Sequence, residues 1–242
     1  MKEMVYKNNR KFGSVVLDEC FYKDYEYFII SRHTHPCTYI CIDNKNIFFK
    51  KEYNEIPLEC HGGLTYSDSV IHSVMQYSDK YKCDINTTID REWVIGWDYA
   101  HFEDYMGYDD QFFNKGKRWT TLQLKEEVEQ VIDCLIEQEK ECFKQHLIKE
   151  LEEQIYDHYC YYDETIEIET WEELHDWALD VYVNGIRIED DDELYEKMVE
   201  ITKENAEEMI DSIENFVDEE CQRYYGDPAF SSASDYWHYI LG

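Results

Sequence analysis

Two kinds of apolar pattern divide this sequence, and they constrain its fold more than any other feature. In the first hundred residues, β-branched and aromatic residues form short runs between polar or turn residues, at 14–17, 25–31 and 38–43. Such runs are typical of β-strands. From Trp119 onward, apolar residues recur every three or four positions, as in amphipathic helices. The sequence therefore predicts an α+β protein, with a mixed or antiparallel sheet in its N-terminal part and an acidic, mainly helical C-terminal part.

Local signals refine the first part of this prediction. Residues 43–46 carry turn-forming side chains and predict a hairpin turn into a strand at 47–49. Residues 64–66 and 93–97 predict two more buried strands, and the polar segment 67–91 between them predicts a loop or insertion. A helix is expected to begin near Trp119 and to run towards Leu147. We place a domain boundary after residue 140, giving a motif-bearing domain at 1–140 and an acidic helical domain at 141–242.

The second part carries sharper helix and turn signals. Thr170 and Glu173 match a capping box, which predicts a helix through residue 179. Residues 181–188 surround an Asn-Gly pair and predict a two-residue hairpin, and Asp190–Asp192 is expected to cap a long helix. A short strand is expected at 165–169. The aromatic segment 236–241 either docks on the core or binds a partner, and docking is the commoner outcome.

Charge is concentrated in the second part. The chain has 55 acids and 23 bases, and the residues from Glu141 onward hold 30 of the acids and 6 of the bases. Such a field repels nucleic acid and anionic membranes and attracts cationic protein surfaces. We therefore expect no direct binding of nucleic acid or membrane, and a protein partner with a basic surface, although a solvated helix face is the simpler interpretation. The candidate contact residues are Asp190, Asp191, Asp192, Glu193, Glu196, Glu207, Glu208, Asp211, Glu214, Asp218 and Glu219.

The nine cysteines show no short disulfide framework, and neither a signal peptide nor an apolar run long enough for a bilayer is present. These features favour a cytoplasmic setting with free thiols. Zinc is a possible cofactor, because many potential ligands fall in one half of the chain: His33, His35, Cys37, Cys41, Cys60, His61, His72, Cys83 and His101. Structural zinc sites usually show two closely spaced ligand pairs. Only Cys37 and Cys41 have such spacing, so we expect no metal and no other cofactor.

Two glycine-containing stretches, 59–67 and 93–101, carry the residues most able to do chemistry. Two adjacent glycines permit positive φ or a close approach of the backbone to another group. The candidate ligand-binding residues are Cys60, His61, Gly62, Gly63, Thr65, Tyr66, Asp98, His101 and Asp104.

Several interpretations of these residues remain open. Cys60 or Ser67 is a possible nucleophile with His61 or His101 as its base, and Cys60 with His101 is the more plausible pair. The two glycines could instead hold an anionic ligand. The residues could also only build the fold, with the histidines hydrogen-bonded in the core and Asp98 as a turn or cap. No reaction is specified, and we expect binding rather than catalysis.

These motifs resemble a group of uncharacterised proteins found mainly in bacteriophages and prophages. The resemblance rests on His35-Pro36, on the run 39–42, on 60–67 and on 95–101, followed by a tryptophan-led acidic helix, and it spans residues 14 to about 140. In that group, a similar His-Gly-Gly-Leu-Thr-Tyr run precedes a Gly-Phe-Asp-Cys-Ala-His-x-x-Asp run. Asp104 falls where the group's closing acid would be. Tyr99 stands where the group tends to have cysteine, which argues against a ligand or nucleophile at that position.

The resemblance implies a phage or mobile-element protein that acts inside a bacterium. Combined with the charge, it leads to the hypothesis of an accessory protein that binds and inhibits a nucleic-acid-handling defence effector of the host. Such an inhibitor would be anti-CRISPR-like and could mimic DNA through its acidic surface. The alternative is an enzyme that binds a metal or nucleotide, or a protein that sequesters a small ligand, with the Cys60–Gly63 and Asp98–His101 residues as its pocket.

Overall fold

The computed structural model describes residues 14–32, 34–78, 83–105, 116–162 and 168–224. The chain divides into two compact units, Met1–Glu139 and Lys140–Gly242. Mostly antiparallel strands dominate the first unit and helices dominate the second, which confirms the expected α+β class. No helix in the described ranges is both long and apolar enough to cross a bilayer.

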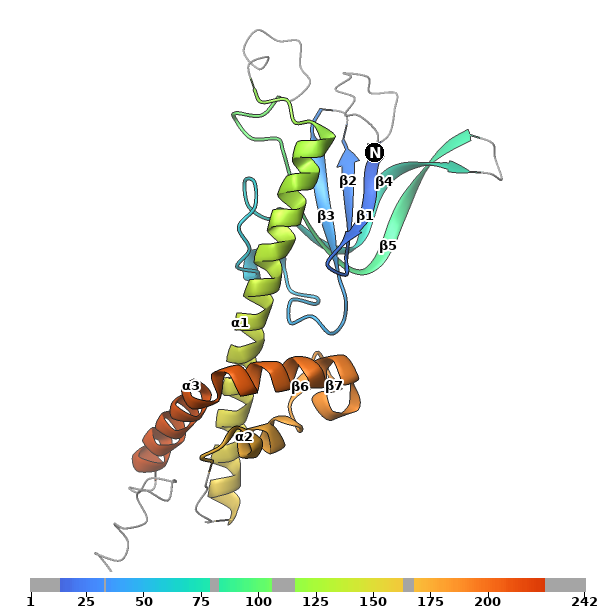
Figure 1. Ribbon diagram of the computed structural model, residues 1–242. Coiled ribbons are helices and arrows are strands. Elements are labelled where there is room, and N and C mark those ends of the chain that lie inside the picture. Colours follow the sequence, from blue (N-terminus) through green and yellow to red (C-terminus); the bar gives the residue numbers. More distant parts are fainter. Residues whose placement is uncertain (1–13, 33, 79–82, 106–115, 163–167, 225–242) are drawn as a thin grey trace, which may run out of the picture. The chain divides into compact units, whose positions relative to one another are not determined.

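A closed five-stranded barrel forms the first unit (Figure 1). Its strands are β1 (Ser14–Tyr22), β2 (Tyr25–Ser31), β3 (Pro36–Ile42), β4 (Tyr66–Ser78) and β5 (Cys83–Asp98). They follow the order β1-β2-β3-β5-β4, and neighbouring strands are antiparallel except for a short parallel pairing of β1 with β4. That parallel pairing closes the barrel.

Burial on both faces explains why β2 reads as a continuous apolar run. Phe28 and Ile30 point into the barrel core, together with side chains from β3, β4 and β5. The alternate residues Tyr27 and Ile29 are equally buried, on the other face of the strand. A strand buried on one face alone would alternate between apolar and polar residues.

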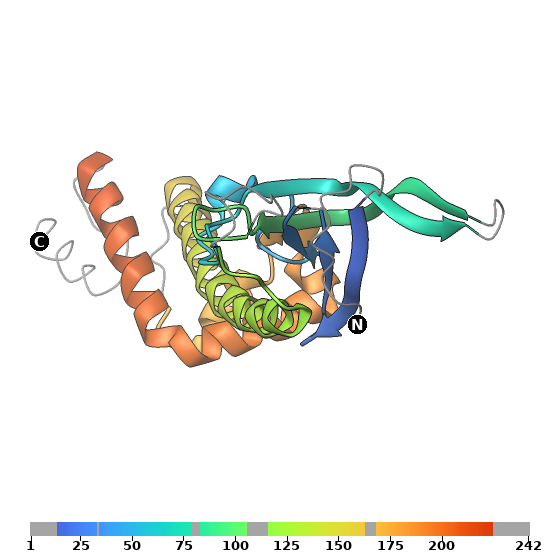
Figure 2. The ribbon, with the colours of Figure 1, turned by 90° about the horizontal axis from the view of Figure 1, so that it is seen from above.

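The segment at 67–91 was expected to be a loop, and this prediction is wrong. It forms most of β4 and β5, which pair antiparallel from Tyr66–Gly96 to Ser78–Cys83. Their far ends extend away from the other three strands (Figures 1 and 2). The register shifts twice, between Asp68 and Val70 and between Ile71 and Val74. Each irregularity interrupts the two-residue alternation from which a strand is recognised.

The strand expected at 47–49 is also absent from the structure, because side chains close a series of turns there. The Asp43 carboxylate accepts hydrogen bonds from the backbone N–H groups of Lys45 and Asn46, and the Asn46 side chain accepts one from Phe48. A short 3₁₀ helix, η1 (Tyr53–Glu55), follows. The strand expected at 64–66 begins only at Tyr66.

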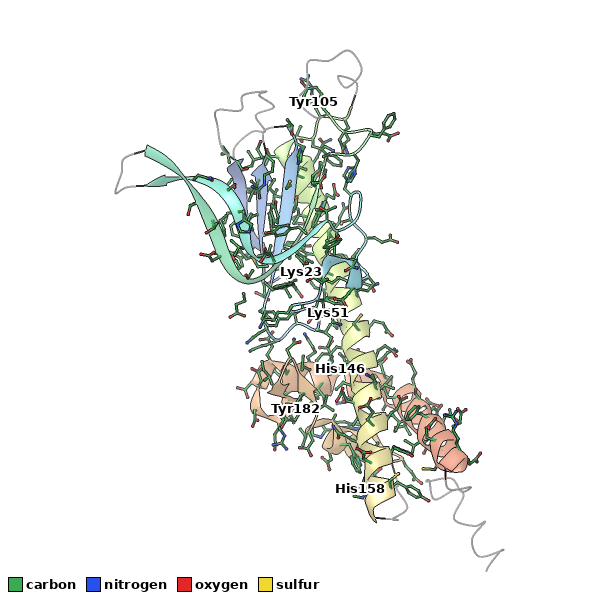
Figure 3. The ribbon with its side chains drawn as sticks, turned by 180° about the vertical axis from the view of Figure 1, so that it is seen from behind. Lys23, Lys51, Tyr105, His146, His158 and Tyr182 are labelled. Carbon is green, nitrogen blue, oxygen red and sulfur yellow. The ribbon has the colours of Figure 1, made fainter. Side chains whose placement is uncertain are left out.

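Helix α1 (Thr121–Tyr162) begins close to the expected position but continues well beyond Leu147. Its residues up to Glu139 belong to the first unit, where the apolar residues that recur at helical spacing are buried: Leu124, Val128, Val131, Ile132 and Leu135. The Tyr25 hydroxyl donates to the Glu139 carboxylate at 2.5 Å and links β2 to the helix. Lys23, at the turn between β1 and β2, forms an ion pair with Asp133 (Figure 3).

The second unit contains the remainder of α1 together with α2 (Trp171–Ala178), β6 (Tyr182–Val183), β7 (Ile186–Arg187), the 3₁₀ helix η2 (Ile188–Asp190) and α3 (Asp192–Tyr224). The capping box at Thr170 and Glu173 is confirmed. So is the hairpin, in which Asn184 and Gly185 have φ values of 51° and 82°. His146 of α1 bonds the carbonyl oxygen of Tyr182 (Figure 3). Residues 165–167 of the expected strand lie outside the described residues, and 168–169 form no strand; the aromatic segment 236–241 also lies outside the described residues.

Candidate functional site around His61 and Asp104

A tight turn at Cys60–Gly63 places His61. The N–H of Gly63 donates to the carbonyl oxygen of Cys60 at 3.0 Å, and both glycines have positive φ, 71° and 84°. A Cβ atom added at Gly62 would lie 1.6 Å from Nε2 of His101, whereas one at Gly63 would meet nothing within 4 Å. The expected positive φ and close approach are therefore both present at Gly62.

Asp104 is the centre on which the two motif stretches converge. Its Oδ2 lies 2.8 Å from Nε2 of His61 and accepts the backbone N–H of His101 at 3.1 Å. Its Oδ1 accepts the indole N–H of Trp119 at 2.8 Å. Burial alone would raise the pKa of this carboxyl group, but the bonds from Trp119 and His61 lower the pKa below its ordinary value. Asp104 is therefore a buried, charged hydrogen-bond acceptor.

The charge on Asp104 fixes the tautomer of His61. An ionised carboxylate can only accept hydrogen bonds, so the proton of the neutral ring must be on Nε2. Its Nδ1 then carries the lone pair and can act as a base or a ligand. The side chain of His61 is 28% exposed, whereas that of Asp104 is 2% exposed. The arrangement therefore presents an oriented imidazole to solvent.

Aromatic rings hold this imidazole from several sides. The ring of His61 stacks on Tyr99 with centroids 4.9 Å apart, and it meets the edge of Trp119 at 5.1 Å. The ring of His101 lies 5.1 Å away, tilted by 55°. Tyr105 directly follows Asp104 and lies at the end of the first unit where α1 begins (Figure 3). The Tyr105 N–H bonds Lys117, which keeps the Asp104 segment beside the start of the helix.

Glu127 of α1 supplies a second carboxyl group. One oxygen accepts the backbone N–H of His61 at 3.3 Å, and the other is buried without a hydrogen-bond partner among the described residues. Burial raises the pKa of Glu127. Burial and the Glu127 charge together raise the pKa of the Cys60 thiol to about 12. A thiol with that pKa is protonated at neutral pH, which disfavours Cys60 as a nucleophile.

The remaining candidates lie apart from this cluster. Thr65 donates to Asp98 at 3.2 Å, and Asp98 also accepts the N–H of Ala100, so it caps the end of β5. Tyr66 donates to the carbonyl oxygen of Val70 and packs edge-on against Tyr39. The hydroxyl of Ser67 bonds Glu52. Of the expected site residues, the structure brings together His61, Gly62, His101 and Asp104.

Zinc has no evident position in the described part of the chain. No three His, Cys, Asp or Glu side chains gather there as metal ligands would. Cys41, which was paired with Cys37 in the zinc hypothesis, donates its thiol to Glu26 instead. His33 lies outside the described residues, and the expectation about cofactors stays a prediction.

Three residues of the cluster were not among the candidates: Tyr99, Trp119 and Glu127. Tyr99 lies within the second motif stretch, where it was considered only as a departure from the cysteine of the phage group. Trp119 was noted only as the start of a helix, and Glu127 is an acid in the early turns of that helix. Their contribution comes from the packing of α1 on the barrel, which local sequence patterns do not encode.

The acidic candidates fall into two groups along α3, because the helix is kinked at Asn205, where φ is −124°. Asp190 to Glu196 precede the kink, and Asp191 caps the helix by accepting the N–H groups of Glu193 and Leu194. Glu208 pairs with Lys144 at 3.1 Å. Asp191 and Glu208 therefore each make a specific contact within the second unit, and neither is simply a solvated charge.

The second half of α3 carries what we call the carboxylate stripe: Glu207, Asp211, Glu214 and Asp218. Their spacing of four, three and four residues places them on one side of the helix over about 16 Å. In the described part of the second unit, no acidic side chain is buried. Burial and the charges of Asp211 and Asp218 raise the pKa of Glu214, and Glu169 adds to this effect. The stripe is therefore a cluster of mutually repelling charges.

Comparison of the chain with family models, with curated proteins and with solved structures finds no match. The resemblance to phage proteins stays a prediction.

Proposed function

We propose that the protein binds a cationic surface of another protein through the carboxylate stripe of α3. The observation that carries the proposal is the placement of Glu207, Asp211, Glu214 and Asp218 on one side of an exposed helix. Like charges three and four residues apart destabilise a helix. A partner that presents lysine and arginine at matching positions relieves this repulsion on binding.

The chemistry of the stripe favours a partner whose basic surface normally holds nucleic acid. Duplex DNA presents a dense row of negative charges, and proteins bind it with clustered lysine and arginine. A row of helical carboxylates offers such a groove the same sign of charge. Together with the resemblance to phage proteins, this leads us to propose a phage-encoded inhibitor of a nucleic-acid-handling defence effector in the bacterial cytoplasm, such as a CRISPR nuclease complex.

Competition for DNA tests the proposal. Purified CRISPR nuclease complexes are loaded with fluorescent target DNA, and the protein is titrated in at 50 to 300 mM salt. We expect displacement of the DNA that weakens as salt rises. The stripe variant, which removes all four charges, should lose the displacement: Glu207→Gln, Asp211→Asn, Glu214→Gln, Asp218→Asn.

The matched control removes four exposed charges from elsewhere in the second unit: Glu153→Gln, Glu172→Gln, Asp176→Asn, Glu204→Gln. Both variants have the same net charge, so a general charge effect would weaken them equally. Displacement that is insensitive to salt, or an equal loss in both variants, would contradict the role of the stripe.

A further inference from the structure

We propose that His61 is the general base of a second, separate site that hydrolyses a phosphodiester of a small nucleotide, with Asp104 and Trp119 as positioning residues. This site lies wholly in the first unit and shares no residue with the carboxylate stripe. Three observations carry the proposal: the orientation of His61, the cations near it, and a fully exposed aromatic ring.

The hydrogen bonding and stacking of His61 fit a general base better than a core histidine. Its Nε2 is engaged by Asp104 at 2.8 Å, and stacking on Tyr99 fixes the plane of the ring. The Nδ1 edge is then the basic edge of a partly exposed ring. When Nδ1 takes up a proton, the Asp104 carboxylate stabilises the imidazolium that forms. A carboxylate paired in this way improves a histidine base by orientation and charge.

Two cationic side chains near the cluster favour an anionic substrate: Lys117 lies over the Trp119 ring and Arg118 lies over the Tyr105 ring. Lys117 and Arg118 are both exposed and directly precede Trp119 in the sequence. The Lys117 ammonium lies 3.0 Å from the centre of the Trp119 ring, whose edge meets His61. The ring of His101 adds a second imidazole 5.1 Å from the first. In a chain with 55 acids and 23 bases, two exposed cations near this cluster favour a phosphate over a neutral ester.

Phe102 points to a nucleotide among phosphate esters. It directly follows His101, and its side chain is 100% exposed. An exposed aromatic ring that directly follows a residue of the His61 cluster in the chain can serve as a platform for a nucleobase, and such stacking contributes about 1–3 kcal/mol per base. The Phe102 ring is not packed against the described residues of the first unit. The arrangement therefore fits one nucleobase and the phosphodiester attached to it.

The reaction needs only water as a co-substrate. His61 Nδ1 removes a proton from a water molecule as the water oxygen attacks phosphorus. The bond between phosphorus and the leaving oxygen breaks, and that oxygen takes the proton from the His61 imidazolium. One phosphodiester and one water thus give a phosphomonoester and a free hydroxyl, and His61 returns to its neutral form. General base catalysis of this kind contributes typically about 10²–10⁴-fold.

Hydrolysis of two probes tests the site: 2′,3′-cyclic AMP, which has a base, and bis(p-nitrophenyl) phosphate, which has none. We expect the full-length protein to hydrolyse both. His61→Ala should lower kcat at least about 100-fold, and added imidazole should restore part of the rate, which a merely structural histidine would not allow. Phe102→Ala should raise KM for the cyclic nucleotide alone. Asp104→Asn should lower kcat with little change in KM.

His72→Ala is the matched control, since His72 is an exposed histidine on β4 that bonds neither Asp104 nor His61. It should retain the wild-type rate, as should the stripe variant, which separates this proposal from the proposed binding function. The absence of hydrolysis by the wild-type protein would overturn the proposal, even if the nucleotide binds. A His61→Ala variant with the wild-type rate would overturn it as well.

Discussion

Alanine substitution at the two adjacent glycines separates two causes of destabilisation within one turn. Gly62 and Gly63 both have positive φ, where a residue with a Cβ is strained by about 1–2 kcal/mol. Only the Cβ at Gly62 would collide with His101, at 1.6 Å from Nε2. Overpacking of this kind costs about 1–3 kcal/mol. We therefore expect Gly63→Ala to lose about 1–2 kcal/mol of unfolding free energy, and Gly62→Ala to lose about 1–3 kcal/mol more.

Urea unfolding of both variants at pH 7 measures this difference, with an unchanged m-value as the check that the folded and unfolded states are comparable. The His101 ring can also avoid the new methyl group by rotating away, and NMR of the histidine rings detects that movement. Gly63→Ala should leave the His101 resonances in place. Equal destabilisation of the two variants, together with unchanged His101 resonances in both, would refute the close approach of His101 to Gly62.

Three further predictions concern single side chains. Asp104→Asn places an amide against three N–H donors and should cost about 1–3 kcal/mol of unfolding free energy. Because the pKa of Asp104 is lowered in the fold, the wild-type protein should lose stability as pH falls through that pKa, and acid unfolding should show no such loss in the variant. Glu214→Gln should raise stability by about 0.4–1 kcal/mol at low salt, because two like-charge pairs disappear. The pKa of Glu214 is raised, so the wild-type protein should gain stability relative to the variant as pH falls through that pKa. Thermal melts from pH 7 to 4 measure this gain. Thr170→Ala should cost about 1 kcal/mol, seen as earlier thermal loss of helical signal, because it removes the cap of α2.

Local chemistry explains which elements could be predicted from the sequence. The capping box at Thr170 and the Asn184-Gly185 turn use their own side chains and backbone, so their signals survive in any context. The strands β2 and β3 are buried on both faces and read as apolar runs. The hairpin of β4 and β5 has neither advantage: its register shifts twice, and its side chains are mostly polar. Residues 76–78 of β4 and 83–90 of β5 pair with no third strand among the described residues.

The candidate site divides in the same way. His61, His101 and Asp104 were predicted as candidates because histidine and aspartate beside glycine are conspicuous in the sequence. Trp119 and Glu127 join them only when the start of α1 packs on the barrel, and the bond between Glu127 and His61 links residues 66 positions apart. The split of the acidic residues by the kink at Asn205 was equally hidden, because the acids occur on both sides of it.

The three donors on Asp104 do not serve the fold equally. The indole of Trp119 satisfies one oxygen and the N–H of His101 the other, so both oxygens of the buried carboxylate are already paired without His61. A third bond from a partly exposed ring adds little stability, because a net hydrogen bond contributes about 0.5–1.5 kcal/mol and water competes for this donor. What the third bond does determine is the tautomer and orientation of the imidazole. A structural role explains Trp119 and the backbone of His101, but it leaves the partial exposure of His61 without a reason, whereas a general base needs both a buried partner and a ring that solvent reaches, and the side chain of His61 is 28% exposed.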